Sequence, residues 1–435
     1  MKSHNAILGA FLVAWTIGTA AALTATVLTI NTYPEKQTGE VLGVAVPHRP
    51  IATQPVQTPT LNVVIDTSDH INQPEIVIAG TDVSLAKFSF VAVNSAWQVK
   101  KFRLLVSSPS LIQEIRIMNE RTRLQEGPTL KPNPAGVVMF SGLLTIPANQ
   151  IGLYSVRATL KPIPTGTLSG HIVSVTMKND IGTFEAVGGP QGKTTITDIK
   201  KDKIGPQKVY RKTKPTLASL PIPLTTLANG TPLLYRLSIT ADKKGPVSWK
   251  HLELEVKTLD TGGAALRLDT PSNSASIKET DTASYIPGSS SITTADNKPC
   301  VGTARCIFRA TFAKERIIPA GATKSYDVYI GVKGADSPAE SVSAALLPDT
   351  ELVTGELEQT KQTPSRLSID DLLGTNPLKE YRFIWSDGSE GKKHNDIADP
   401  TLSDDRLPGD AKAANDWMNG RLVRTLPGAT RTLAR

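Results

Sequence analysis

The two cysteines of this chain, Cys300 and Cys306, have the spacing that most directly predicts a covalent bond. Outside the cytoplasm, cysteines this close in sequence usually form a disulfide. Closing so short a loop stabilises a fold by about 2 kcal/mol on the chain-entropy model. A metal site is the alternative, but no histidine or carboxylate lies beside the pair at zinc-finger spacing. We therefore predict a disulfide that closes a surface loop.

The remaining polar residues do not form a catalytic pattern. The 6 histidines are scattered, without His-Glu-x-x-His or another metal-ligand spacing. A nucleophile elbow, a phosphate-binding loop and a dinucleotide fingerprint are missing from the sequence as well. The separation of two catalytic carboxylates depends on the fold, so a carboxylate hydrolase remains a remote alternative. We predict no enzyme, no catalytic residue, no metal and no cofactor.

A basic segment, residues 200–214, holds seven Lys or Arg and one Asp. Such a patch gains affinity for a polyanion by releasing condensed counterions, while the alternative interpretation is a solvated hinge. Only Tyr210 offers a ring for base stacking, so we predict no nucleic-acid partner and keep wall polymer or lipid as candidates. The candidate polyanion contacts are Lys200, Lys201, Lys203, Lys208, Arg211, Lys212 and Lys214.

Trp417 follows an acidic stretch near the end of the sequence. The regular Asp-x-Asp-x-Asp-Gly calcium loop is absent, so residues 386–435 are interpreted as a polar C-terminal tail. An aromatic ring in such a tail needs a folded surface or another molecule, which makes Trp417 a candidate partner contact. The carboxylates before it are Asp396, Asp399, Asp404, Asp405, Asp410 and Asp416.

The N-terminal residues predict export. Ala6 to Ile30 carry no charge over 25 residues, and a helix of that length spans about 37 Å, enough for a hydrocarbon core of about 30 Å. Lys2 and the amino group place the N-terminus in the cytoplasm by the positive-inside rule. Ala20-Ala21-Ala22 resembles a cleavage site, but the apolar run continues beyond it. Residues 1–30 are therefore a transmembrane anchor, or a signal peptide and a secreted product if that site is cleaved.

Composition indicates an all-β protein. Hydrophobic residues make up 39 %, Gly and Pro number 32 and 31, and long helical periodicity is hard to find. The net charge of +8 favours anionic surroundings without choosing among them. Residues 31–60 are predicted to form an extended stalk because they carry the prolines Pro34, Pro47, Pro50, Pro55 and Pro59.

An internal repeat organises the rest of the chain. At an offset of 150, one period-two strand matches another: Phe102, Leu104 and Val106 against Leu252, Leu254 and Val256. At an offset of 172, Tyr154, Val156, Ala158 and Leu160 match Tyr326, Val328, Ile330 and Val332. The change of offset predicts an insertion between Lys257 and Phe308. In the second copy His251, Glu253 and Glu255 alternate with apolar residues, which predicts a solvated face.

These strands predict two tandem antiparallel β-sandwiches of immunoglobulin-like type, residues 61–199 and 215–385. The same alternation permits a barrel, but nothing in the sequence indicates a closed ligand-holding lumen. Trp385 shares the parity of Tyr381 and Phe383, so these three side chains are expected to face the second core.

The segments Phe383-Ile384-Trp385-Ser386-Asp387 and Asp416-Trp417-x-Asn419-Gly420 resemble the closing motif of poorly characterised exported surface proteins of candidate-phylum bacteria. The resemblance implies an exported envelope protein and no catalytic residues. This chain departs from the pattern at Gly388 and in its longer acidic insert.

We therefore expect a membrane-anchored envelope protein with a structural or adhesive role. Its partners would be the membrane, through the N-terminal segment, and an envelope polymer or another surface protein. The rival hypothesis is a binding module for carbohydrate or wall polymer, which requires an exposed aromatic platform. The tryptophans that could supply one outside the anchor are Trp97, Trp249, Trp385 and Trp417.

Overall fold

The computed structural model describes residues 58–163, 169–189, 192–271, 274–349, 382–389, 417–423, 426 and 429–435. All of them belong to one compact unit, Gln57–Arg435. The predicted anchor, nearly all of the predicted stalk, Tyr381 and the acidic residues Asp396 to Asp416 lie outside the described residues. Within the described part of the chain, no helix is long and apolar enough to cross a membrane.

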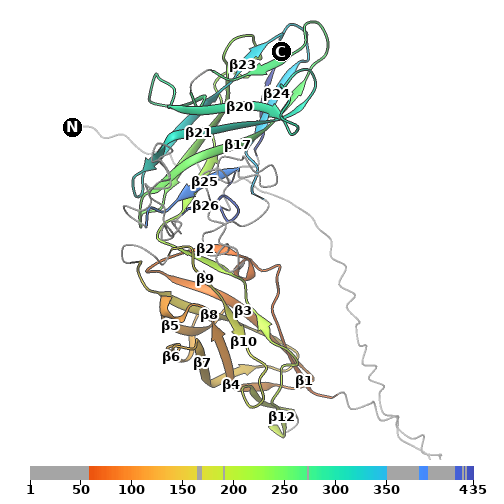
Figure 1. Cartoon of the computed structure of the whole chain (residues 1–435). Helices are drawn as coiled ribbons and strands as arrows, with labels where there is room; N and C mark the ends of the chain where they lie inside the picture. The colour runs from red at the N-terminus through yellow and green to blue at the C-terminus, as the bar shows by residue number, and fades with distance from the viewer. Residues whose placement is uncertain are drawn as a thin grey trace, which may run out of the picture. The chain divides into compact units, whose positions relative to one another are not determined.

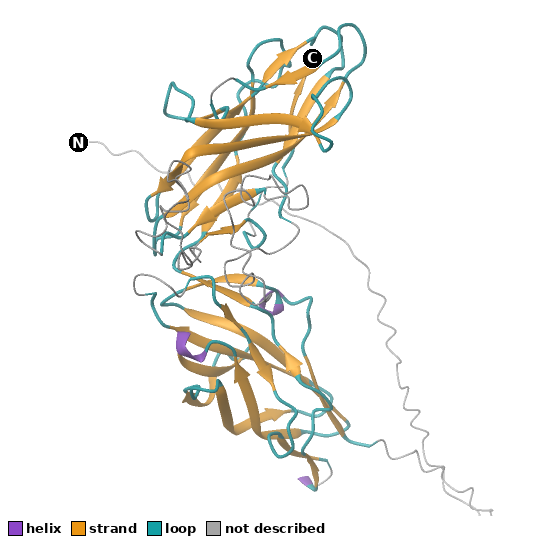
Figure 2. Cartoon of the chain, viewed as in Figure 1, coloured by secondary structure: helices purple, strands orange, loops and turns teal. Residues whose placement is uncertain are grey.

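The first copy of the repeat forms two sheets (Figure 1), and its long strands, such as β4 and β7, bury alternate side chains. One has the order β1 (Thr60–Val64), β3 (Asp82–Val93), β8 (Ile151–Leu160), β5 (Ile112–Asn119) and β6 (Gln125–Leu130). The other has the order β12 (Thr194–Ile196), β11 (Glu185–Gly188), β4 (Trp97–Val106), β10 (Val175–Met177) and β13 (Lys203–Ile204), and β7 (Val137–Ile146) also pairs with β4. Short 3-10 helices, η1 (His70–Asn72) and η2 (Pro109–Leu111), lie in the connections (Figure 2).

The second copy also forms two main sheets. One has the order β15 (Pro215–Ser219), β16 (Leu233–Ala241), β22 (Thr323–Tyr329) and β19 (Ile277–Glu279). The other has the order β20 (Gly288–Thr294), β21 (Arg305–Ile318), β17 (Val247–Leu259), β24 (Ser341–Ala345) and β27 (Arg431–Ala434). β25 (Phe383–Ser386) pairs with β17 and with β26 (Trp417–Asn419), while β18 (Arg267–Asp269) pairs with β23 (Gly331–Lys333).

The all-β fold predicted from the sequence is confirmed, and the two copies pair alike. Phe88 lies opposite Tyr154 in the first copy, and Leu237 lies opposite Tyr326 in the second. The interval predicted to hold the insertion, between Lys257 and Phe308, contains β18, β19 and β20. Of these, β19 is equivalent to β5, because Ile277 lies opposite Val328 as Ile117 lies opposite Val156. The repeat therefore reflects equivalent strand pairs.

Aromatic side chains fill both cores. In the first, the rings of Phe102 and Phe140 stack with centroids 4.5 Å apart. In the second, Trp249 meets Phe312 edge-on at 4.5 Å and Tyr326 at 4.7 Å. Such contacts add about 0.5–1.5 kcal/mol per pair beyond the burial of apolar area. The expectation that Phe383 and Trp385 face the second core is confirmed, because both are 0 % exposed.

The predicted solvated face of β17 is wrong: His251 and Glu253 are only 3 % and 2 % exposed. Each has a partner on β21, since Arg309 Nε donates to Glu253 Oε1 at 2.7 Å and His251 Nδ1 lies 2.8 Å from Thr311 Oγ1. Glu255, also buried, forms an ion pair with Arg305. Burial raises the pKa of Glu253, but the hydrogen bonds and charges of His251 and Arg309 outweigh it, so the pKa lies below its usual value.

The interpretation of residues 386–435 as a polar tail is also wrong for the described residues. β26 pairs with β25, and β27 pairs with β24 from Ser341 opposite Ala434 to Ala344 opposite Arg431. Met418 and Leu433 are each 1 % exposed and belong to the second core. The strands were missed because each is only three or four residues long, too short for a period-two pattern to stand out.

A three-stranded sheet replaces the predicted linker. Its order is β2 (Glu75–Ile78), β14 (Lys208–Arg211) and β9 (Ile172–Val173), with β2 and β14 parallel. Alternate side chains of β2 point to opposite faces, so Ile76 and Ile78 belong to the second core whereas Val77 belongs to the first. The interpretation of residues 200–214 as a hinge is therefore wrong over β14.

Candidate functional site

Lys208, a predicted polyanion contact, is an internal residue. Its side chain is 0 % exposed, and its ammonium forms an ion pair with Glu75 Oε1 at 2.7 Å. The same nitrogen donates to the carbonyl oxygens of Ile71 at 2.8 Å and Gln73 at 2.9 Å. Three acceptors saturate a lysine ammonium, so its assignment as a polyanion contact was wrong.

Arg211 is also buried, in a group of residues that we call the charged joint: Ser169, Arg211, Trp385, Asp387 and Trp417. Arg211 donates to Ser169 Oγ at 3.2 Å and to the carbonyl oxygen of Trp417 at 3.3 Å, and its guanidinium lies 5.8 Å from the centroid of the Trp385 ring. Ser169 Oγ in turn donates to Asp387 Oδ2 at 2.6 Å. The backbone N–H of Lys212 donates to the same oxygen at 2.7 Å.

The charged joint corrects two predicted sites. Arg211 is 0 % exposed and Trp417 is 2 % exposed, so neither contacts a partner from the surface. The polar groups of the joint come from segments far apart in the sequence. Counting the charges within one segment, such as residues 200–214, cannot reveal such partners. Burying a cation without partners is very unfavourable, which explains why these residues gather here.

The rest of the basic segment is more accessible. Lys200 and Lys201 are exposed, and Lys203, Lys212 and Lys214 are half-buried. Partial burial, and then the charges of Lys201 and Lys200, lower the pKa of Lys203. Polyanion contact by these five lysines stays a prediction.

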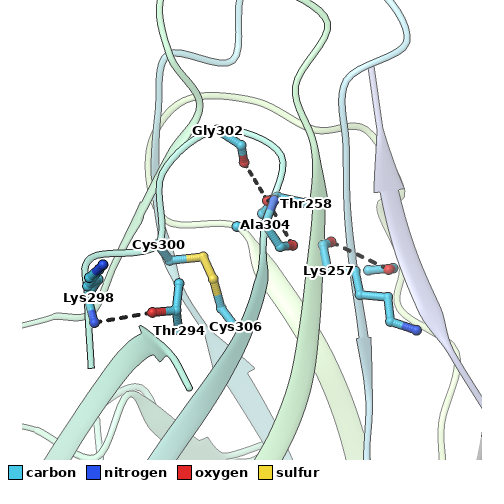
Figure 3. The surroundings of a disulfide bond; sticks show 9 residues. Lys257, Thr258, Thr294, Lys298, Cys300, Gly302, Ala304 and Cys306 are labelled. Carbon is cyan, nitrogen blue, oxygen red and sulfur yellow. Dashed lines mark hydrogen bonds between the residues drawn. A yellow bond between two sulfur atoms is a disulfide. The ribbon is translucent and has the colours of Figure 1, made fainter. Parts of the chain in front are cut away.

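The predicted disulfide is confirmed: Cys300 and Cys306 are bonded (Figure 3). Both cysteines are 0 % exposed, although Val301 between them is 44 % exposed. Thr258 Oγ1 on β17 donates to the carbonyl oxygen of Gly302 at 2.6 Å. The bond therefore closes a loop whose middle is at the surface while its sulfur atoms lie in the second core.

Replacing both cysteines, Cys300→Ala with Cys306→Ala, is expected to lower the free energy of unfolding by about 2 kcal/mol. The reason is the greater conformational freedom of the unfolded chain without the cross-link. Chemical denaturation measures the loss, and the reduced wild-type protein should show a similar one. Free-thiol labelling of two cysteines in the native protein would contradict the assignment.

Asp349 connects three late segments of the chain. It follows β24, is 1 % exposed, and its carboxylate accepts hydrogen bonds at 2.6 Å from the backbone N–H groups of Arg382 and Gly420. Burial raises the pKa of Asp349 to about 6, although these two hydrogen bonds act in the opposite direction. A Cβ atom at Gly420 would lie 2.9 Å from Asp349 Oδ2, so the close approach requires glycine.

Stability is expected to rise on mild acidification. Because the pKa of Asp349 is higher in the folded chain than its ordinary value of 3.8, the folded state binds the proton more tightly. The stabilisation is fully present below that ordinary value and is lost as pH rises through about 6. We expect the free energy of unfolding to be greater at about pH 5 than at about pH 7 by on the order of 1 kcal/mol.

Denaturant titrations at both pH values measure this difference, and Asp349→Asn is the matched control. Asn keeps the size of the side chain and cannot titrate, so the contribution from this position should disappear. An unchanged pH dependence in the variant would assign the effect to other groups.

None of the four tryptophans in the described residues forms an exposed platform. Trp97, Trp249 and Trp385 are 0 % exposed and Trp417 is 2 % exposed, so these four residues do not support that form of the carbohydrate hypothesis. Two half-buried tyrosines, Tyr285 and Tyr329, were not among the candidates predicted from the sequence. Tyr329 has the opposite parity to the buried Val328 on β22, and this signal places its ring on the outer face.

Among the described residues, no group of three or more His, Cys, Asp or Glu side chains is placed to hold a metal ion. A pocket of about 270 Å³ lies at the connection between β15 and β16. Its lining is Pro223, Leu224, Thr226, Ala228, Asn229, Thr231, Pro232 and Leu233, without an acidic or basic side chain.

No family model and no curated protein matches the chain. Among solved structures, the C-terminal domain of the antigen I/II polypeptide BspA of Streptococcus agalactiae is 11 % identical, covering 66 % of this chain and 95 % of that chain with a TM-score of 0.16. The C-terminal domain of the Streptococcus pyogenes antigen I/II-family protein AspA is 9 % identical, covering 67 % and 95 % with a TM-score of 0.17. TM-scores this low carry no argument about function.

Proposed function

We propose that this protein is exported and serves the cell envelope as a structural or adhesive element that acts through surface contacts. The observation that carries the proposal is the Cys300–Cys306 disulfide. Such bonds persist in oxidising compartments and are rare in the cytosol. The uncharged run from Ala6 to Ile30 supports the same location, with residues 1–30 retained as a single-pass anchor.

The architecture of the described residues fits a structural role better than catalysis. In the charged joint, Arg211 and Asp387 are both hydrogen-bonded to Ser169. The pocket beside β16 has no titratable lining residue. An enzyme of the carboxylate class needs convergent acids in a cleft. We propose that the protein is not an enzyme, and that its contacts are made by exposed strand faces and loops.

Export is tested by expressing the full chain in a bacterial host and treating intact cells with a protease that does not enter them. The proposal expects cleavage of the sandwiches in intact cells, recovery of the chain with membranes, and no free thiol. A control chain without residues 1–30 should be protected inside the cell. Sequencing the mature N-terminus completes the test.

The outcomes separate the two parts of the proposal. A soluble exported product that begins near Leu23 would overturn the anchor and leave export intact. A protected wild-type chain with reduced cysteines would overturn export itself.

A further inference from the structure

Two tyrosines and a lysine form an aromatic corner in the second sandwich: Lys278, Tyr285 and Tyr329. The tyrosine rings meet edge to face, with centroids 5.8 Å apart and an interplanar angle of 86°. The ammonium of Lys278 lies 4.5 Å from the centroid of Tyr285 and 4.9 Å from that of Tyr329. All three side chains are half-buried, so the corner is open to solvent.

Backbone pairing fixes each member of the aromatic corner. Tyr329 ends β22, and its N–H donates to the carbonyl oxygen of Ser276 at 2.9 Å. Lys278 lies on β19, the strand paired with β22. Tyr285 is held by the next residue, because the N–H of Ile286 donates to the carbonyl oxygen of Ile277 at 2.8 Å. The corner is therefore set by the sheet.

The two carboxylates beside Lys278 in the sheet, its cross-strand partner Asp327 and its chain neighbour Glu279, are paired with other cations. Asp327, opposite Lys278 in the sheet, receives two hydrogen bonds from Arg236, one of them 2.8 Å long. Glu279 forms ion pairs with Arg316 at 2.9 Å and Lys324 at 2.8 Å. Lys278 thus keeps ammonium N–H groups for a ligand.

The phenol groups are also free to bind. Among the described residues, neither the hydroxyl of Tyr285 nor that of Tyr329 has a hydrogen-bond partner. Burial, and then the neighbouring Tyr329, raises the pKa of Tyr285, so its hydroxyl stays a neutral donor at physiological pH. The corner offers one cation, two hydroxyls and two apolar rings.

The first sandwich has no such corner at the equivalent position. Val156 and Val328 match in the repeat and lie opposite Ile117 and Ile277, so Arg157 corresponds to Tyr329. There, Arg157 and Arg116 both form ion pairs with Asp82, at 2.7 Å and 2.8 Å. In the first copy the cations at this position form ion pairs with a carboxylate. In the second copy the cation lies beside aromatic rings instead.

We propose that the aromatic corner binds an acidic saccharide of the cell envelope. The ammonium would make a charge-assisted hydrogen bond to a carboxylate or sulfate of the sugar, and the rings would pack against its C–H groups. Cation–π contact with the two rings holds the ammonium in place. Leu233, opposite Tyr329 in the sheet, also lines the pocket, which gives the saccharide adjacent apolar surface. This binding function is additional to the structural role and does not depend on whether the anchor is retained.

The test is calorimetric titration of the purified full chain in detergent with oligogalacturonate, which bears carboxylates, with dextran sulfate, and with neutral dextran. Binding to one or both anionic glycans and none to dextran is expected. Lys278→Met keeps the apolar stem and removes the charge, and it should weaken binding by about tenfold. Tyr329→Phe keeps the ring and loses one hydroxyl, and it should weaken binding by about threefold.

The matched control is Lys131→Met with Lys193→Met, which removes two exposed charges of the first sandwich outside every predicted contact and should leave the affinity within about twofold. Equal loss in this control would assign the binding to general charge and overturn the site. Wild-type affinity in Lys278→Met, or failure of both anionic glycans to bind, would overturn it too. Thermal unfolding of each variant shows whether it is folded. If Lys278→Met does not fold, Tyr329→Phe, which preserves the packing, is the test variant, and wild-type affinity in it would overturn the site.

Discussion

Removal of residues 417–435 is expected to abolish the cooperative unfolding of the second sandwich. The deletion takes away β26 and β27 and uncovers β24, which pairs with β27. It also removes Trp417, Met418 and Leu433, which are 1–2 % exposed. A buried large apolar side chain contributes about 2–5 kcal/mol, and a domain is stable by only about 5–15 kcal/mol. Differential scanning calorimetry should show a heat-absorbing transition for the first sandwich alone.

Two single substitutions on β27 provide the graded comparison. Leu433→Ala removes a side chain that is 1 % exposed and should cost about 2–5 kcal/mol. Thr432→Ala, at the exposed neighbouring position, should change the stability by less than about 0.5 kcal/mol. A truncated protein with an unchanged second transition would show that the last strands are dispensable.

Asp387→Ala is expected to destabilise the charged joint by about 2–4 kcal/mol. The carboxylate accepts from Ser169 Oγ at 2.6 Å and from the backbone N–H of Lys212 at 2.7 Å. Its loss leaves these buried donors without their acceptor and removes the negative charge that Ser169 links to Arg211. Urea titration followed by tryptophan fluorescence measures the effect, since Trp385 and Trp417 lie in the joint.

Asp387→Asn separates charge from hydrogen bonding. The amide keeps one acceptor oxygen and nearly the same volume but carries no charge. If compensation of the Arg211 cation dominates, this variant should be almost as unstable as Asp387→Ala. Stability close to that of the wild type would assign the effect to hydrogen bonding, and a neutral result for both variants would contradict the role of the joint.

Strand pairs with many alternating apolar residues were predictable from the sequence. The matched tyrosines Tyr154 and Tyr326 lie on equivalent strands and face equivalent partners, because buried positions in a sheet recur every second residue. The disulfide was predictable because its two cysteines are only 6 residues apart, so the pairing is a local feature of the sequence.

Buried charges were not predictable, because their partners are distant in sequence. Lys208 looks like part of a solvated basic run until Glu75, 133 residues earlier, is placed beside it. Glu253 looks like a surface residue until Arg309 on the neighbouring strand is known. The aromatic corner was missed because only tryptophans were weighed as exposed platforms, and because the backbone pairing that brings Tyr285 beside Lys278 and Tyr329 cannot be read from the sequence.

The pairing of β24 with β27 has a consequence for the folding of the new chain. Ser341 lies opposite Ala434, 93 residues later, and β17 of the same sheet begins at Val247. Closing contacts of such long range is slow, because the entropy of loop closure is lost before the contacts form. Until residues 431–434 have left the ribosome or the translocation channel, β24 presents unpaired backbone groups that can associate with other strands. We therefore expect the second sandwich to be the part of the new chain that depends most on a chaperone before its last strand is available.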